Sequence, residues 1–198
     1  MAPAIPPLLT WAGCFLPYGL SAFGKPVAPG TLTDLVSGMV ESGLIPQDRR
    51  VFLLDGRLYE KMTKTKAHGY VGAAIDRAVN RRLPDGWCLW PESTVVLDPT
   101  NAPLPDFAVV RGANALDFAA PERYPGPGDI GLLIEVAVTS LHDDLTTALE
   151  QYARASIPAY WVVDVPGRHI LVHTEPRVVD GQGKYARVQT YRPGHRRT

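Results

Sequence analysis

Three acidic residues stand at the ends of segments predicted to form strands. Asp106 opens DFAVV, Glu135 lies near the end of GLLIEVA, and Glu60 closes the apolar part of VFLLDGRLYEKM. Two carboxylates that converge within about 4 Å of one point can hold Mg²⁺ or Mn²⁺, hard cations that take oxygen ligands and keep several waters. Such a cation would polarise a phosphodiester and lower the pKa of an attacking water. These residue types therefore indicate metal-assisted hydrolysis, provided that the fold brings the acids together.

The same residues also have a simpler interpretation. Acids at strand ends are commonly solvated, and three of them in a chain of 198 residues are unremarkable. His68 begins a predicted helix, where a histidine is more often a surface or capping residue than a catalytic one. The residues alone leave both interpretations open.

The elements that would position these residues follow from apolar periodicity and turn signals. Asp55-Gly56 within residues 51–62 is a strong hairpin signal. Helices are predicted at 31–44, 68–83 and 141–155, where apolar residues recur at helical spacing. Short apolar runs predict strands at 94–98, 106–110, 131–137, 159–164, 168–173 and 185–191. This order predicts an α/β fold in which helices flank a mixed β-sheet.

Length and composition indicate one soluble domain. The 198 residues suffice for a single α/β domain, which we place at 31–192. Residues 1–30 form an N-terminal extension that need not be rigid, and 193–198 a basic tail. Prolines interrupt the apolar N-terminus and no basic segment precedes it, so we expect no signal peptide and no membrane span. Two cysteines make no disulfide framework, which fits the cytoplasm.

Charge is uneven along the chain although the formal net charge is zero. Residues 61–82 hold six Lys or Arg against one Asp, so this stretch is the candidate contact for DNA phosphates. A solvated helix face explains the same charges equally well. The sequence has no G-x-S-x-G, phosphate-binding glycine loop or dinucleotide fingerprint, which argues against those enzyme classes.

An ordered set of motifs resembles a known bacterial family. PLPDFAVV, then LLIEVAVTSL, then QYARASIPAYWVVD follow LLDGRLYEKM and His68. From about Leu32 to Tyr191 the chain is similar to the Uma-two family of restriction endonucleases in the PD-(D/E)XK nuclease superfamily. The resemblance implies a restriction-endonuclease-like core and a Mg²⁺- or Mn²⁺-dependent DNA endonuclease. It also implies that Asp106 and Glu135 are metal ligands, with Glu60 and His68 in the site.

Three departures from that pattern fall near the implied site. The family's helix lysine, four residues after an aspartate that matches Asp144, is Ala148 here. Phe52 and Val138 stand where the family commonly has acids. Removing one pre-organised electrostatic group typically lowers the rate ~10²–10³-fold, so we expect an eroded site. Substitutes for the missing cation are Lys61, Lys64 and Lys66, although each is more typical of a solvated loop lysine.

Three functions stay open at this point. The first is the metal-dependent DNA endonuclease. The second is an inactive nuclease-fold protein that binds a partner, and the third is a repurposed pocket for a small molecule or peptide. A homodimer is compatible with all three. A collapsed site would favour the second function over the third, and a hollow one the reverse.

Overall fold

A computed structural model describes residues 32–46, 48–112 and 124–194. The extension predicted at 1–30 lies outside the described residues, as does most of the tail at 193–198. Among the described residues, no helix is long and apolar enough to cross a membrane.

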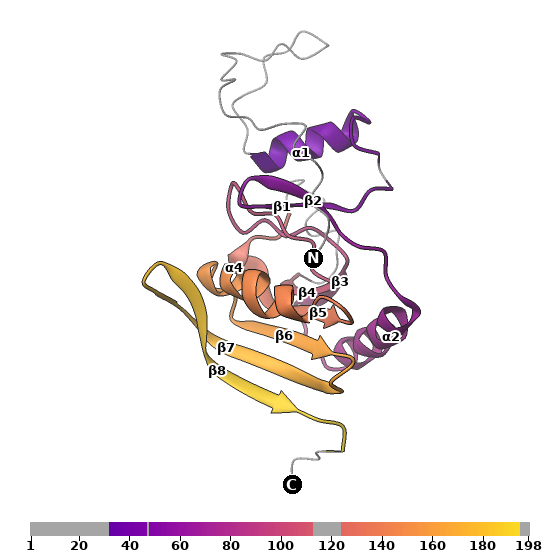
Figure 1. The fold of residues 1–198 in the computed structure, drawn as a ribbon, viewed down its shortest axis with the longest axis vertical. Coiled ribbons are helices and arrows are strands. Elements are labelled where there is room, and N and C mark those ends of the chain that lie inside the picture. Colours follow the sequence, from indigo (N-terminus) through magenta and orange to yellow (C-terminus); the bar gives the residue numbers. More distant parts are fainter. Residues whose placement is uncertain (1–31, 47, 113–123, 195–198) are drawn as a thin grey trace.

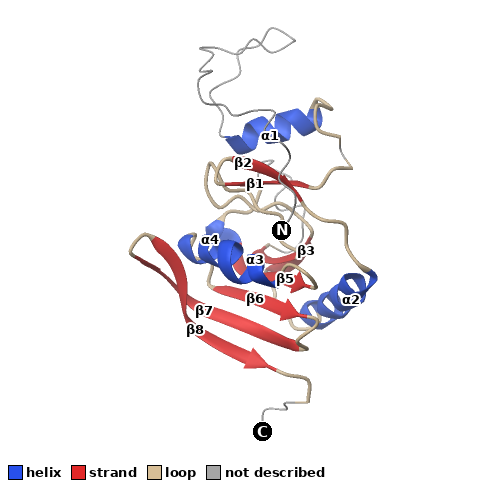
Figure 2. Cartoon of the chain, viewed as in Figure 1, coloured by secondary structure: helices blue, strands red, loops and turns tan. Residues whose placement is uncertain are grey.

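A six-stranded mixed sheet forms the centre of the fold (Figure 1, Figure 2). Its strands lie in chain order: β3 (Trp87–Pro91), β4 (Phe107–Arg111), β5 (Ile130–Ala137), β6 (Ala159–Asp164), β7 (His169–Val179) and β8 (Gln182–Tyr191). Strands β5 and β6 are parallel, and the other neighbouring pairs are antiparallel. The predicted mixed α/β fold is confirmed.

The helices lie on both faces of this sheet. Parallel strands need a crossover, and the chain between β5 and β6 provides it as one continuous helix. Its parts are α3 (Leu141–Asp143), a π-helical turn η3 (Asp144–Ala148) and α4 (Leu149–Arg154), and α4 packs on β7 and β8. The helix α2 (Lys66–Asn80) contacts β3 and β5. A 3₁₀ turn η2 (Pro127–Asp129) precedes β5, and α1 (Leu32–Glu41) precedes the hairpin.

Strand β5 explains why the core has two parts. Successive side chains of a strand point to opposite faces, and a strand covered on both faces is apolar throughout. Leu133 and Ala137 belong to the cluster that contains Tyr152, on the side of the crossover helix. Ile134 and Val136 belong to the cluster that contains apolar residues of α2. One residue on the first of these faces, Glu135, is charged.

The hairpin forms a separate two-stranded sheet of β1 (Val51–Leu54) and β2 (Arg57–Glu60). Asp55 and Gly56 both have positive φ, 45° and 70°, as the predicted tight turn requires. Leu53 ties the hairpin to the loop before β4, because its N–H and C=O both pair with Ala102, at 3.1 and 3.0 Å.

One predicted strand is wrong and one was missed. Within residues 94–98, Val95 and Leu97 are buried, and Val95 is only 1% exposed. However, the N–H groups of Val95 and Val96 donate to the carbonyls of Pro103 and Pro125 in loops rather than to a sheet neighbour. The edge strand is β3 instead. Trp87 of β3 covers Gly131 so closely that a Cβ there would lie 2.7 Å from the indole.

Candidate active site

The register of β4 and β5 brings two of the predicted acids together. Phe107 pairs with Ile134 and Ala108 with Leu133; one step further, Asp106 stands opposite Glu135. The backbone N–H of Asp106 donates to Glu135 Oε2 at 3.3 Å, and that of Val136 donates to Asp106 Oδ2 at 2.8 Å. Asp106 is 2% exposed and Glu135 is 8% exposed. The acids are therefore buried neighbours, not solvated strand termini.

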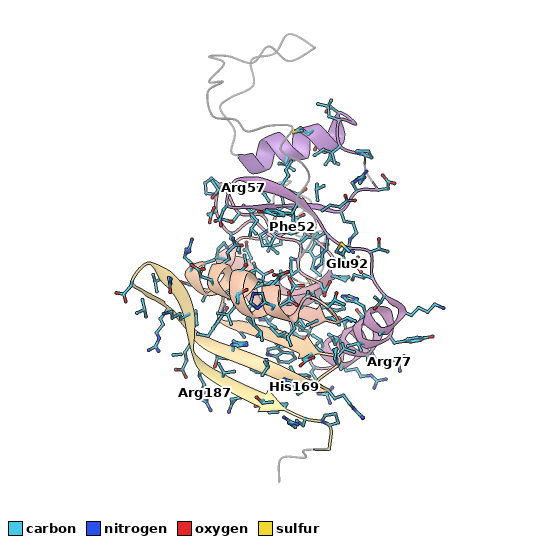
Figure 3. The ribbon with its side chains drawn as sticks, viewed as in Figure 1. Phe52, Arg57, Arg77, Glu92, His169 and Arg187 are labelled. Carbon is cyan, nitrogen blue, oxygen red and sulfur yellow. The ribbon has the colours of Figure 1, made fainter. Side chains whose placement is uncertain are left out.

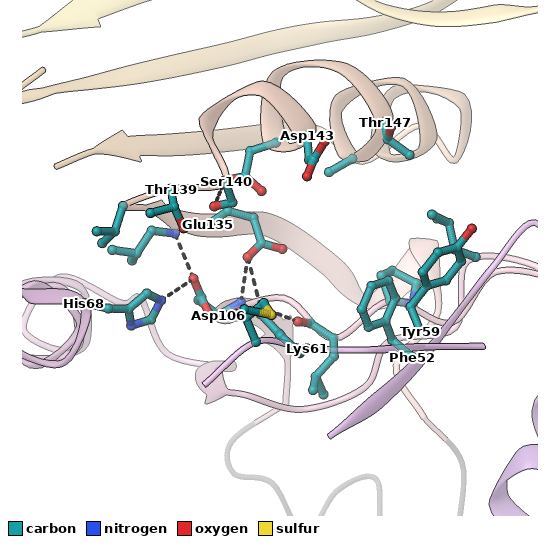
Figure 4. A pocket seen from close by; sticks show the side chains of 18 of the residues that line it. Phe52, Tyr59, Lys61, His68, Asp106, Glu135, Thr139, Ser140, Asp143 and Thr147 are labelled. Carbon is teal, nitrogen blue, oxygen red and sulfur yellow. Dashed lines mark hydrogen bonds and ion pairs between the residues drawn. The ribbon is translucent and has the colours of Figure 1, made fainter. Parts of the chain in front are cut away.

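Lys61 lies between these two carboxylates (Figure 4). Its Nζ is 2.9 Å from Asp106 Oδ1 and 3.2 Å from Glu135 Oε2, and it donates to the carbonyl of Leu104 at 2.7 Å. The expectation of a solvated loop lysine is thus wrong for this residue. It is also wrong for Lys64, which pairs with Glu92 and lies 3.5 Å from Asp106 Oδ1. Lys66, by contrast, is exposed as expected.

Glu60 is not brought to this group. Along β2, side chains alternate between the two faces of the hairpin, so Tyr59 and Lys61 point toward the carboxylates and Glu60 points away. Its carboxylate pairs instead with Arg49 at 2.5 Å. An assisting role for Glu60 stays a prediction that this geometry does not support.

His68 does reach the acids. Thr65 caps α2 by accepting from the backbone N–H of His68 at 3.2 Å, which fixes the first turn of the helix. From this turn the ring Nε2 of His68 lies 2.9 Å from Asp106 Oδ2, and the residue is 8% exposed. The histidine therefore orients the aspartate rather than facing solvent.

The crossover helix supplies the opposite wall. Tyr152 donates its hydroxyl to Glu135 Oε1 at 3.0 Å. Asp144 is 8% exposed and accepts from Ser140 Oγ at 2.7 Å. Asp144 and Ala148 are the first and last residues of the π-helical turn, a type of irregularity that is frequent at functional sites.

These walls enclose a cavity of about 490 Å³ (Figure 4). The hairpin contributes one side and the crossover helix the other. The three positions at which an apolar residue replaces a charged one, Phe52, Val138 and Ala148, all line it. The site is hollow rather than collapsed, and its volume is within the range of small-ligand sites. Figure 3 shows Phe52 on the side of the hairpin that faces the sheet.

Burial and pairing set the charges of the central group. Burial opposes ionisation of Asp106, but the hydrogen bond with His68 and the charge of Lys61 outweigh it, so its pKa is well below the usual range. Burial raises the pKa of Glu135 to about 8, with Asp106 adding to the effect and Lys61 opposing it. Burial lowers the pKa of Lys61, but the two acids reverse this and raise it. Pairing therefore favours the ionised form of Asp106 and the charged form of Lys61, whereas burial opposes ionisation of Glu135.

The donor set suits a hard divalent cation. Asp106 Oδ1 is buried and its partners among the described residues are the ammonium groups of Lys61 and Lys64. With Glu135 it offers the carboxylate oxygens that Mg²⁺ prefers. Within the described ranges, no group of three or more His, Cys, Asp or Glu converges to hold a metal. A cation here would rest on these two carboxylates with water and substrate oxygens, and it would have to displace the ammonium of Lys61.

The basic stretch at 61–82 is divided by the fold. Lys61 and Lys64 point into the cavity, whereas Arg77, Arg81 and Arg82 are exposed at the end of α2 and just beyond it. It is therefore not one continuous patch. Contact with DNA through its side chains stays a prediction.

Fold and site together define a nuclease-like protein with a buried carboxylate pair. The family model described as "Uma2: Putative restriction endonuclease" matches residues 40–198, so the chain belongs to the Uma2 family. This confirms the family that the motifs indicated.

A solved structure supports the fold. It is a protein from Anabaena variabilis ATCC 29413 described as a putative nuclease belonging to DUF820. It superposes with a TM-score of 0.52 at 12% identity, over 82% of this chain and 84% of that one. At such identity the likeness shows the fold alone. No protein with a curated function matches the chain.

Proposed function

We propose that this protein is a divalent-metal-dependent nuclease that hydrolyses phosphodiester bonds of DNA. The observation that carries the proposal is the ammonium of Lys61 at 2.9 and 3.2 Å from two facing buried carboxylates in a hollow site. Membership of the Uma2 family supports DNA as the substrate.

Each residue has a distinct part in this proposal. Asp106 and Glu135 would hold Mg²⁺ or Mn²⁺, which when bound supplies Lewis-acid polarisation of the phosphate and a more acidic water. His68 and the Val136 N–H hold Asp106 Oδ2, so the other oxygen, Oδ1, would be the one to bind the cation. Tyr152 fixes Glu135 through Oε1. These contacts keep both carboxylates in place before substrate arrives.

Lys61 takes the part of the missing helix lysine. Ala148 cannot supply a charge, but Lys61 reaches the carboxylates from the hairpin on the other side of the cavity. Released from the carboxylates, its ammonium would meet the charge that develops on the phosphate. The site would thus be rebuilt rather than eroded.

The test is cleavage of supercoiled and single-stranded DNA by the purified protein, with Mg²⁺ or Mn²⁺ against EDTA. We expect metal-dependent nicking that is lost in Glu135→Ala, a variant that excludes a contaminating nuclease. Ala148→Lys would be assayed beside them. Because Lys61 already supplies the cation, we expect this variant to change the rate less than tenfold. Cleavage that appears only with Ala148→Lys would mean that Lys61 does not replace the lost lysine.

A second candidate is binding of a small molecule or peptide without cleavage. The size of the cavity and its apolar lining at Phe52, Val138 and Ala148 favour it over an inactive, collapsed nuclease fold. Absence of cleavage by the wild type and by Ala148→Lys alike would leave this candidate in place of the nuclease.

A further inference from the structure

The cavity has two chemically different ends (Figure 4). Lys61, Asp106 and Glu135 lie at the charged end, with His68 beyond them, and the rings of Phe52 and Tyr59 lie at the other. Both ends are part of one continuous cavity. A ligand that fills it would place a polar or charged group beside Lys61 and a flat apolar group on the rings.

The hairpin fixes the spacing of these two ends. Phe52 and Tyr59 are cross-strand partners, and their rings stack with centroids 5.5 Å apart and planes 22° from parallel. Lys61 follows Tyr59 by two positions on the same face, a rise of about 7 Å. This spacing is comparable to the separation of the phosphate and the base within one nucleotide.

The helix wall opposite the rings carries small polar groups. Thr147 and Asp143 line this wall, and Ser140 lies further along it, beside Glu135 (Figure 4). Hydroxyl and carboxylate oxygens are suited to the polar edge of a base whose flat face lies on an aromatic ring. The wall thus offers groups for the edge while the hairpin offers a surface for the face.

We propose that the cavity receives one unstacked nucleobase against Phe52, with the adjoining phosphate at Lys61. This rests on the proposed function and narrows it, since the preferred substrate becomes a nucleic acid with an unpaired nucleotide. A paired base can enter a concave site only after extrusion from the helix, which costs unstacking and unpairing energy. The zero formal net charge gives no general attraction to duplex phosphates that would offset this cost.

The test measures binding without catalysis, with Ca²⁺, a hard cation that takes oxygen ligands, in place of Mg²⁺ and with EDTA as the comparison. The probe is a short single-stranded oligothymidylate with one 2-aminopurine, whose emission falls when the base stacks on an aromatic ring. We expect quenching with the wild type. Affinity should be at least tenfold weaker for the same strand in a duplex, and ~5–100-fold weaker for a strand of the same length in which every position is abasic.

Variants locate the stacking surface. Phe52→Leu keeps an apolar side chain but removes the ring, so it should weaken single-strand binding ~5–100-fold and abolish quenching. Phe52→Trp keeps a ring and should retain both, which separates loss of stacking from loss of the hairpin. Tyr70→Leu is the matched control, because Tyr70 is 79% exposed on α2 and does not line the cavity. It should leave binding unchanged.

The outcomes separate this inference from the proposed hydrolysis. Equal affinity for single strand and duplex, or unchanged binding by Phe52→Leu, overturns the base site even if DNA is cleaved. Binding that depends on the ring, without metal-dependent cleavage, supports the base site and refutes the proposed hydrolysis. No binding to any oligonucleotide overturns the inference as well.

Discussion

A lysine between two buried carboxylates contributes more to the stability of the folded site than a lysine on a surface loop does. Lys61 is the cation nearest to both Asp106 and Glu135 among the described residues, and burial makes their interaction strong. Without it two acids would remain together in a site with little water. Removing one partner of such a buried group generally costs several kcal/mol. The lysine is thus needed by the folded site whether or not substrate is present.

Substituting Lys61 tests this at the residue scale. We expect Lys61→Met to lower the cleavage rate ~10²–10³-fold, because the ammonium no longer meets the phosphate charge. Mn²⁺ binding should become tighter, because the cation no longer competes with an ammonium for the two carboxylates. Isothermal titration with Mn²⁺ and a cleavage time course measure the two effects.

Lys66→Met is the matched control for this substitution. Lys66 lies five residues further along the chain and is exposed on α2, so neither quantity should change. Weaker Mn²⁺ binding by Lys61→Met would contradict the view that Lys61 and the metal occupy the same place.

The candidate site shows which residues a sequence can reveal. Asp106, Glu135 and His68 were predictable because motif order and strand ends identify them. Glu60 and Lys61 are adjacent, and strand alternation allows only one of them to face the site. Which one does so depends on the face of the hairpin that packs against the sheet. That face is marked by Phe52 of β1 and Tyr59 of β2, the two aromatic residues that line the cavity. Lys61 follows Tyr59 by two positions, and this alternation is the signal that could have identified the lysine.

At the scale of elements, the π-helical turn keeps a carboxylate where it costs stability. Burial raises the pKa of Asp144 to about 6, although the hydrogen bond from Ser140 opposes the shift. Below the usual pKa of an aspartate both the folded and unfolded states are protonated. As pH rises toward 6, Asp144 ionises in the unfolded chain before it does so in the folded protein. The free energy of unfolding therefore falls over this range. Above about pH 6 Asp144 is ionised in both states, and the loss of stability stays at its full value.

We therefore expect Asp144→Asn to stabilise the protein at pH 8, by at most about 3 kcal/mol. Asparagine cannot ionise, and its amide oxygen can still accept from Ser140. The gain should shrink as pH falls and vanish below about pH 4. Urea unfolding of both proteins between pH 4 and 8 measures it. A gain that is the same at every pH would show that ionisation of Asp144 is not its cause.

Close packing of the crossover helix on the sheet gives a second prediction at this scale. Strand β8 passes under α4 at Gly183, where a Cβ would lie 2.0 Å from the carbonyl oxygen of Glu150 and 2.4 Å from the backbone nitrogen of Arg154. Backbone atoms cannot move aside as a flexible side chain can. We expect Gly183→Ala to push the helix from the strand and destabilise the fold by about 1–3 kcal/mol or more.

Gly69→Ala is its control. Gly69 lies within α2 with nothing within 4 Å of an added Cβ, so alanine should stabilise the helix by about 1 kcal/mol. Chemical denaturation of the two variants compares them directly. Similar stability of both variants would contradict the close approach of α4 to β8.

At the scale of the whole molecule, the sequence predicted the central strands of the sheet but not the edge strand β3. Strands β4, β5 and β6 are nearly continuous apolar runs because helices or loops cover both of their faces. The edge strand β3 carries Trp87, Cys88 and Trp90, which are partly buried and do not alternate with polar residues. The run at 94–98 has the stronger strand pattern, but it buries only Val95 and Leu97 and its N–H groups at Val95 and Val96 pair with loops. Burial was therefore predictable, whereas sheet membership depended on tertiary partners.

The domain boundary predicted at residue 31 provides the last test. Among the described residues, all members of the two core clusters come after residue 70. Because the predicted domain begins at residue 31, we predict that the free energy of folding does not depend on residues 1–30. We expect a chain without them to unfold within about 2 °C of the full-length midpoint, since even 1 kcal/mol moves a chain of this size by only about 2–4 °C. A larger loss would place part of 1–30 in the domain.

An unchanged midpoint with altered cleavage or oligonucleotide binding would instead give the extension a role at the cavity, because a segment can cover a site without contributing to the core. Thermal unfolding and the binding assay, run on the same two preparations, distinguish these outcomes.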